Sequence, residues 1–119
     1  MKIALVDWNG VTQIGTNRAY SHGPNSLRLI TLRDYLYSEG FENVELIPPE
    51  YRVRAKNPRE LFDEMNRQMM SYRPDIISIS VDSWDYALSI RMAAEWKKRL
   101  DNGVKVIMGG ASFPGTIHP

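Results

Sequence analysis

The chain has 119 residues, of which 43% are hydrophobic and 24% are charged, a composition typical of one globular domain. Fifteen basic and fourteen acidic residues leave a formal net charge of +1, which argues against a general nucleic-acid or anionic-membrane surface. The absence of cysteine excludes disulfides, thiolate-bound zinc and cysteine-ligated iron–sulfur clusters within this sequence.

The N-terminal segment predicts a buried strand followed by a long loop. Ile3–Val6 is a short apolar run that ends at Asp7. It is too short for a signal peptide or a membrane span, so we expect a cytoplasmic protein without a membrane partner. Glycine and proline recur through residues 8–25, and this spacing predicts a loop.

The next segment predicts a helix and a second strand. Asn25 or Ser26 can cap the helix, and Gly40 can end it. The apolar stripe of this helix consists of Leu29, Leu32 and Leu36. Val44–Ile47 then predicts a short strand, which two prolines stop, and residues 50–56 predict a basic surface loop.

The second helix has the clearest start in the sequence. Asn57 is an N-cap residue, Pro58 occupies the first helical position, and Glu60 completes a capping box. The core-facing residues predicted for this helix are Leu61, Phe62, Met65, Met69 and Tyr72. A break at residues 73–75 leads into a third predicted strand, Ile76–Val81.

The last part predicts one more helix and one more strand. The helix spans Trp84–Leu100, and its apolar residues Leu88, Met92, Trp96 and Leu100 are spaced four apart. The run that starts at Val104 is rich in β-branched residues, does not alternate, and stops at two glycines. Such a run is typical of a parallel strand buried on both faces.

The resulting order, βαβαβαβ, predicts an α/β fold with a doubly wound parallel sheet of the flavodoxin-like (Rossmann-like) type. Residues 1–119 form a single domain in this interpretation. A complete domain of this type has a further strand and one or two further helices, and the fourth strand is otherwise an edge with one side unpaired. We therefore expect a partial domain that another chain or segment completes.

Three unusual segments are expected to converge at the carboxyl ends of the strands, where open α/β sheets bind ligands. The binding residues predicted there are Asp7, Asn9, Ser80, Asp82, Trp84, Gly109, Gly110 and Ala111. The two glycines remove Cβ atoms where a ligand would approach the backbone. No catalytic residue and no metal ligand is predicted, and neither a G-x-G-x-x-G nor a Walker A motif is present.

With these segments in place, the chain resembles the N-terminal cobalamin-binding domain of cobalamin-dependent radical SAM enzymes. The segments that carry the resemblance are residues 73–81, which end a strand at Ser80, and residues 106–114, which contain Gly109-Gly110 followed by Ala111. The resemblance implies that the nucleotide tail of cobalamin passes Ser80 and the two glycines, with the corrin ring above the strand ends. It covers nearly all of the chain but only part of that domain.

The resemblance also bears on the metal. Cobalamin-binding proteins use a D-x-H-x-x-G loop after the first strand, and here Asp7 matches the aspartate whereas Asn9 stands in place of the cobalt-ligating histidine. The implied function is base-off binding without a histidine ligand, and His22 is the one internal candidate for an axial imidazole. A radical SAM domain, with its iron–sulfur cluster and S-adenosylmethionine, would lie downstream, because this chain lacks the cysteines.

Three alternatives remain open at this point. A flavodoxin-like module would bind FMN, and Gly15-Thr16-Asn17 weakly resembles a phosphate-binding loop. A receiver-like signalling domain would use Asp82 as a phosphoacceptor, but only Asp7 of the usual acidic pair is present. An interaction module would bind no cofactor.

Overall fold

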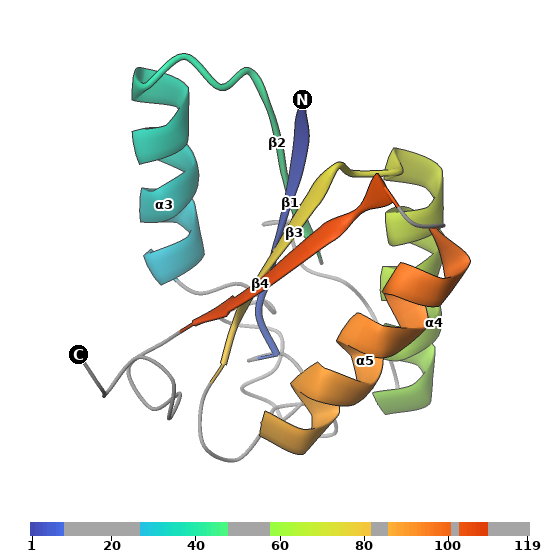
Figure 1. The fold of residues 1–119 in the computed structure, drawn as a ribbon. Coiled ribbons are helices and arrows are strands. Elements are labelled where there is room, and N and C mark those ends of the chain that lie inside the picture. The colour runs from blue at the N-terminus through green and yellow to red at the C-terminus, as the bar shows by residue number, and fades with distance from the viewer. Residues whose placement is uncertain (9–26, 48–57, 82–85, 101–102, 110–119) are drawn as a thin grey trace, which may run out of the picture.

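The computed structural model describes residues 1–8, 27–47, 58–81, 86–100 and 103–109. Strands and helices alternate along the chain, as the sequence predicts (Figure 1). The elements are β1 (Lys2–Val6), α3 (Leu27–Ser38), β2 (Asn43–Ile47), α4 (Pro58–Tyr72), β3 (Ile76–Ser80), α5 (Tyr86–Arg99) and β4 (Lys105–Gly109).

The four strands form one parallel sheet in the order β2-β1-β3-β4. This order confirms the predicted α/β, flavodoxin-like arrangement of the four strands. β1 lies in the interior of the sheet, since it pairs with β2 on one side and β3 on the other, and its residues Ile3–Val6 are buried. β4 pairs with β3 and forms an edge within the described part of the chain.

Helix α3 covers one face of β1 and β2. Leu29 is fully buried there and packs with Ile3, Leu5 and Leu46 in a small apolar cluster. The helix ends as the sequence predicts: Gly40 has a φ of 95°, and the amide of Phe41 donates to the carbonyl of Leu36 at 3.0 Å. The amide of Gly40 also donates to the carbonyl of Tyr37, and the two hydrogen bonds together form a Schellman motif. This motif requires a left-handed residue, a conformation that glycine adopts without strain.

Helices α4 and α5 lie side by side on the other face of the sheet (Figure 1). The residues that form this larger core are buried completely or nearly so, and they include Met65 and Met69 of α4, Trp96 of α5 and Ile77 of β3. The amphipathic pattern of α4 is therefore confirmed for its described side chains.

The predicted stripe of α5 is rotated relative to the observed packing. The residues buried toward the sheet are Ser89, Ala93, Trp96 and Leu100. Leu88 and Met92 are half-buried and line a groove against α4 with Phe62. The difference arises because α5 packs on two neighbours at once, so its apolar residues divide between the sheet and α4.

Two tyrosines, one from each face of the sheet, bind the first two residues of β2. The hydroxyl of Tyr72 donates to the carbonyl of Asn43 at 2.8 Å, and the hydroxyl of Tyr37 donates to the carbonyl of Val44 at 3.2 Å. Charged Glu45 follows and is exposed. The two contacts tie the start of β2 to α3 and to α4.

No helix in the described ranges is long and apolar enough to cross a membrane. The helices run 12, 15 and 14 residues, and each carries charged residues on its outer side.

The packing of α4 gives a direct stability test. Met69 is fully buried, whereas its neighbour Met70 is only partly buried. We expect Met69→Ala to lower the free energy of unfolding by about 2–5 kcal/mol, because it leaves a cavity in the core. Met70→Ala is the matched control and should cost less than half as much in urea unfolding. Equal losses would contradict the assigned orientation of α4.

Candidate functional site

The predicted site residues that the structure describes come together at one edge of the sheet. Ser80, the last residue of β3, lies opposite Gly109, the last residue of β4. Val6 lies opposite Ile79, so Asp7 and Ser80 follow as the next residues of adjacent strands. The three therefore form a row across the carboxyl ends of β1, β3 and β4, as the sequence predicts.

The pairing of β3 and β4 continues beyond Ser80. The amide of Val81 donates to the carbonyl of Gly109 at 2.8 Å, which holds the two strand ends together. Val81 is the residue at which the sequence-based strand was expected to end. Strand pairing before Ser80 and the Val81 hydrogen bond after it thus hold the backbone of Ser80 and Gly109 in place.

The side chains of Asp7 and Ser80 project from the same face of the sheet. Val6 and Trp8 both pack into the core beneath α4 and α5. Because side chains alternate along an extended chain, Asp7 between them projects from the opposite face. The same alternation puts Ser80 on that face, since Ile79 and Val81 belong to the α4–α5 core. Asp7 is only 2% exposed despite its charge.

No described helix covers this face over β3 and β4. Among the described residues, the cluster under α3 includes Ile76 at the start of β3 but none of β4. Further along, Ser78 and Ser80 are half-buried, and Ile107 is 55% exposed. Figure 1 shows α3 on the opposite side of the sheet from α4 and α5. A ligand at the strand ends could therefore extend along the sheet surface between α3 and the β4 edge.

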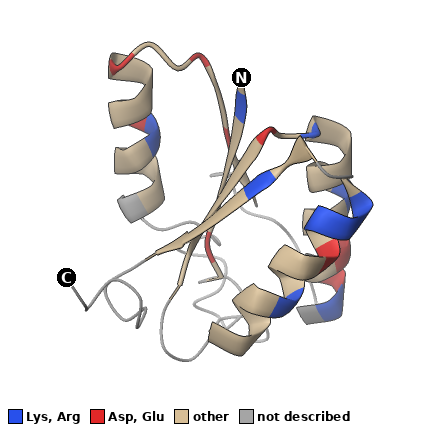
Figure 2. Ribbon diagram, viewed as in Figure 1, with Lys and Arg blue, Asp and Glu red and all other residues tan. Residues whose placement is uncertain are grey.

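The open surface is almost free of charge. Figure 2 shows β3 uncharged and β4 with one basic residue, Lys105, at its amino end. The basic last turn of α5, Lys97 to Arg99, also lies toward the amino ends of the strands. Among the described residues, the carboxyl ends thus present the Ser80 hydroxyl, the backbone of Gly109 and the buried Asp7 carboxylate.

Trp8 directly follows Asp7, at the start of the segment predicted as a loop, and it is anchored in the core. Its side chain is 1% exposed, and its indole N–H donates to the Ser89 hydroxyl of α5 at 2.8 Å. Its ring stacks on Trp96 at 5.9 Å with an interplanar angle of 13°, and meets Phe62 edge-on at 6.1 Å. These contacts fix the direction in which the chain leaves β1 and hence the position of Asp7.

The remaining site predictions are neither confirmed nor contradicted. The residues concerned lie outside the described ranges, and they are Asn9, Asp82, Trp84, Gly110 and Ala111. The same holds for His22 and for the helix caps at Asn25 and Ser26. The described part of the chain therefore tests the geometry of the row only.

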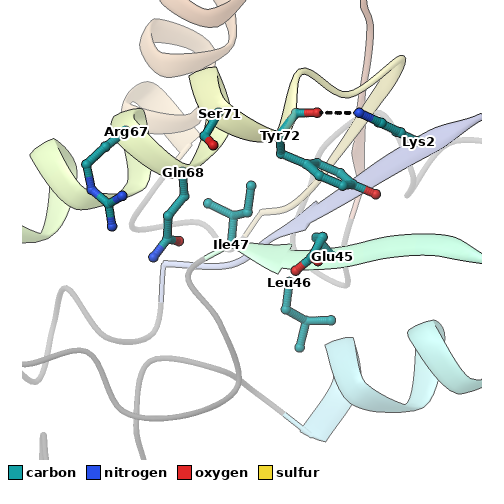
Figure 3. Close-up of a pocket in the computed structure, with 8 residues that line it drawn as sticks. All are labelled: Lys2, Glu45, Leu46, Ile47, Arg67, Gln68, Ser71 and Tyr72. Carbon is teal, nitrogen blue, oxygen red and sulfur yellow. Dashed lines mark hydrogen bonds between the residues drawn. The ribbon is translucent and has the colours of Figure 1, made fainter.

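A separate pocket of about 420 Å³ lies between the edge of β2 and α4, and none of the predicted site residues lines it (Figure 3). Its polar groups are largely engaged within the fold. Lys2 donates through Nζ to the carbonyl of Tyr72 at 3.2 Å, and Arg67 pairs with Glu64. Gln68 donates to Glu64 at 2.8 Å. The Lys2 contact ties the end of α4 to the amino end of the sheet, whereas the contacts of Glu64 lie within α4.

Two ionisable groups near this pocket are shifted by their surroundings. Hydrogen bonding from the Arg67 guanidinium lowers the pKa of Glu64 below its ordinary value. Burial, reinforced by the Glu45 carboxylate, raises the pKa of Tyr72 to about 12. The Tyr72 hydroxyl thus stays protonated and keeps its hydrogen bond to Asn43 across the ordinary pH range.

Within the described ranges, no group of three or more histidine, aspartate or glutamate side chains could hold a metal ion. Comparison with protein-family models, with curated proteins and with solved structures gave no match.

The Trp8–Ser89 contact can be tested by a double-mutant cycle. Ser89→Ala leaves the buried indole N–H without its acceptor and should cost about 1–3 kcal/mol in urea unfolding. Once Trp8→Phe has removed the N–H, the same Ser89→Ala change should cost less, with a coupling energy above about 0.5 kcal/mol. Strictly additive effects would show that the hydrogen bond does not form.

The raised pKa of Tyr72 predicts a loss of stability in alkali. An unfolded tyrosine ionises near pH 10, whereas folded Tyr72 holds its proton to about 12. Between these values the unfolded chain releases a proton that the folded chain keeps, so stability falls as pH rises. Tyr72→Phe should lose about 1 kcal/mol at pH 8, from the missing hydrogen bond.

The same variant should show a shallower decline of stability between pH 10 and 12 than the parent. Urea unfolding at several pH values measures both effects. Tyr35→Phe, on the exposed side of α3, controls for the removal of one tyrosine. Parallel pH profiles for the parent and Tyr72→Phe would contradict the assigned shift.

Proposed function

We propose that this chain binds cobalamin as the N-terminal module of a radical SAM enzyme, a methyltransferase in the first instance. The proposal is supported by one observation above all: Asp7, Ser80 and Gly109 stand in one row at the carboxyl ends of three adjacent strands, beside an open sheet face. This is the place at which a doubly wound sheet binds its ligand.

The residues of the row suit the tail of the cofactor rather than a compact anion. Gly109 has no side chain, so a flat aromatic base could approach the backbone of β4 closely. The hydroxyl of Ser80, on the neighbouring strand, can donate to or accept from a ring nitrogen or a phosphate oxygen. The Asp7 carboxylate can accept from amide or hydroxyl groups of the ligand.

Bound cobalamin would supply the group-transfer chemistry of its cobalt, while the protein binds and orients it. In this proposal Asn9 replaces a histidine, so no protein imidazole coordinates the cobalt and the cofactor is held base-off. The iron–sulfur cluster and S-adenosylmethionine would belong to a downstream radical SAM domain of a cytoplasmic enzyme, since this chain has no cysteine to hold a cluster.

Cobalamin binding can be measured directly with hydroxocobalamin. After incubation and desalting, the protein should retain corrin absorbance shifted toward the base-off form. Gly109→Val should reduce the affinity at least tenfold, because two branched methyl groups would occupy the space that the tail needs. The far-ultraviolet circular dichroism should remain that of the parent, since valine favours strands.

Gly103→Ala is the matched control, because Gly103 lies in an exposed turn where an added Cβ meets nothing within 4 Å. It should bind cobalamin as the parent does. Failure of the parent to retain cobalamin would overturn the proposal, and retention of FMN in the same assay would favour a flavodoxin-like function. Unchanged binding by Gly109→Val would remove Gly109 from the site.

A further inference from the structure

A groove of about 480 Å³ lies between helices α4 and α5. Its volume falls within the range of sites that hold small molecules, about 300–1,000 Å³. The apolar side chains that line it are Phe62 of α4 and Leu88 and Met92 of α5, and each is half-buried. All the lining residues belong to these two described helices, so the groove is formed by the ordered core of the fold.

The amide of Asn66, which also lines the groove, is oriented by a tryptophan. The indole N–H of the fully buried Trp96 donates to Oδ1 of Asn66 at 2.7 Å. An indole N–H can only donate, so the amide oxygen of Asn66 is turned toward Trp96 and the amide nitrogen is turned away from it. Among the described residues, the two N–H groups on this nitrogen have no acceptor. They are therefore donors that a ligand in the groove can use.

The charged residues of the groove leave one guanidinium unpaired. Glu95 accepts a hydrogen bond from Arg99 at 2.8 Å, within α5. Arg91 has no carboxylate partner in the described part of the chain. Two arginines and one glutamate thus give the lining one net positive charge. The groove combines apolar side chains with an excess of hydrogen-bond donors.

We propose that this groove binds a small monocarboxylate with an apolar body. The carboxylate accepts hydrogen bonds from the Asn66 amide and the Arg91 guanidinium, and the apolar body covers the three apolar side chains. A hydrogen bond between a guanidinium and a carboxylate is charge-assisted, and hence stronger than one between neutral groups. One unpaired guanidinium also matches a single negative charge better than the higher charge of a phosphate.

The proposal goes beyond cobalamin binding and does not rest on it. Phe62, Leu88 and Met92 pack against the core beneath α4 and α5, whereas Asp7 and Ser80 project from the other face of the sheet. The two sites are therefore separated by the sheet, and either can be tested without the other.

Octanoate is a suitable probe, because it has one carboxylate and an unbranched apolar chain. Titrated into the protein below the concentration at which it forms micelles, octanoate should bind as one molecule per chain. It should also change the tryptophan emission, since Trp96 is bonded to Asn66. Octylammonium, which has the same chain and the opposite charge, should bind at least tenfold more weakly.

Two variants separate the polar contacts from the apolar one. Asn66→Asp keeps an acceptor for the Trp96 indole and replaces the two donors by a negative charge. It should bind octanoate at least tenfold more weakly than the parent and octylammonium more tightly, with unchanged far-ultraviolet circular dichroism. Arg91→Gln should weaken octanoate binding about tenfold. Lys98→Gln is the matched control, because it removes the same charge from an exposed position of α5 outside the groove.

Unchanged octanoate affinity in Asn66→Asp, or equal losses in Arg91→Gln and Lys98→Gln, would overturn the proposal. Equal binding of octanoate and octylammonium by the parent would do the same. Failure of the parent to bind octanoate would also overturn it, and would leave the groove to the side chains of a partner protein.

Discussion

The structure depends on the pairing of β1 with strands on both sides. β1 is short, yet residues Ile3–Val6 are buried by α3 on one face and by α4 and α5 on the other. Its register with β2 and β3 fixes where every other strand begins and ends. A shift of one residue would turn Leu5 and Val6 to the wrong faces, so the two apolar clusters hold the register. The alignment of the strand ends is therefore a consequence of core packing.

The two faces of this sheet are covered unequally by the described helices, and the candidate site lies beside the less covered face. The α4–α5 face is closed by a dense core that includes two stacked tryptophans. Within the described ranges, α3 covers the opposite face over β1 and β2, and no helix covers that face over β3 and β4. Trp8 packs into the core beneath α4 and α5. It thereby turns the preceding residue, Asp7, toward the α3 face of the sheet. Burial on one face thus positions a carboxylate on the opposite one.

Much of this arrangement follows from local sequence signals. Gly40 ends α3 because it has no Cβ, Pro58 begins α4 because its φ suits the first turn, and parallel strands align their carboxyl ends whatever their sequence. The tyrosine contacts at β2 and the burial of Trp8 could not be predicted in this way. They join residues 7 to 81 positions apart and exist only after the helices have docked.

The carboxyl end of β4 belongs to the candidate site and also lies at the margin of the described sheet. Among the described strands, β4 pairs with β3 alone. β4 also carries Gly109 at its carboxyl end, next to Ser80. The position of Gly109 relative to Ser80 therefore depends on the pairing of β4 with β3, which the Val81 amide extends by one hydrogen bond. The strand that places the site is thus held by backbone contacts with a single described neighbour.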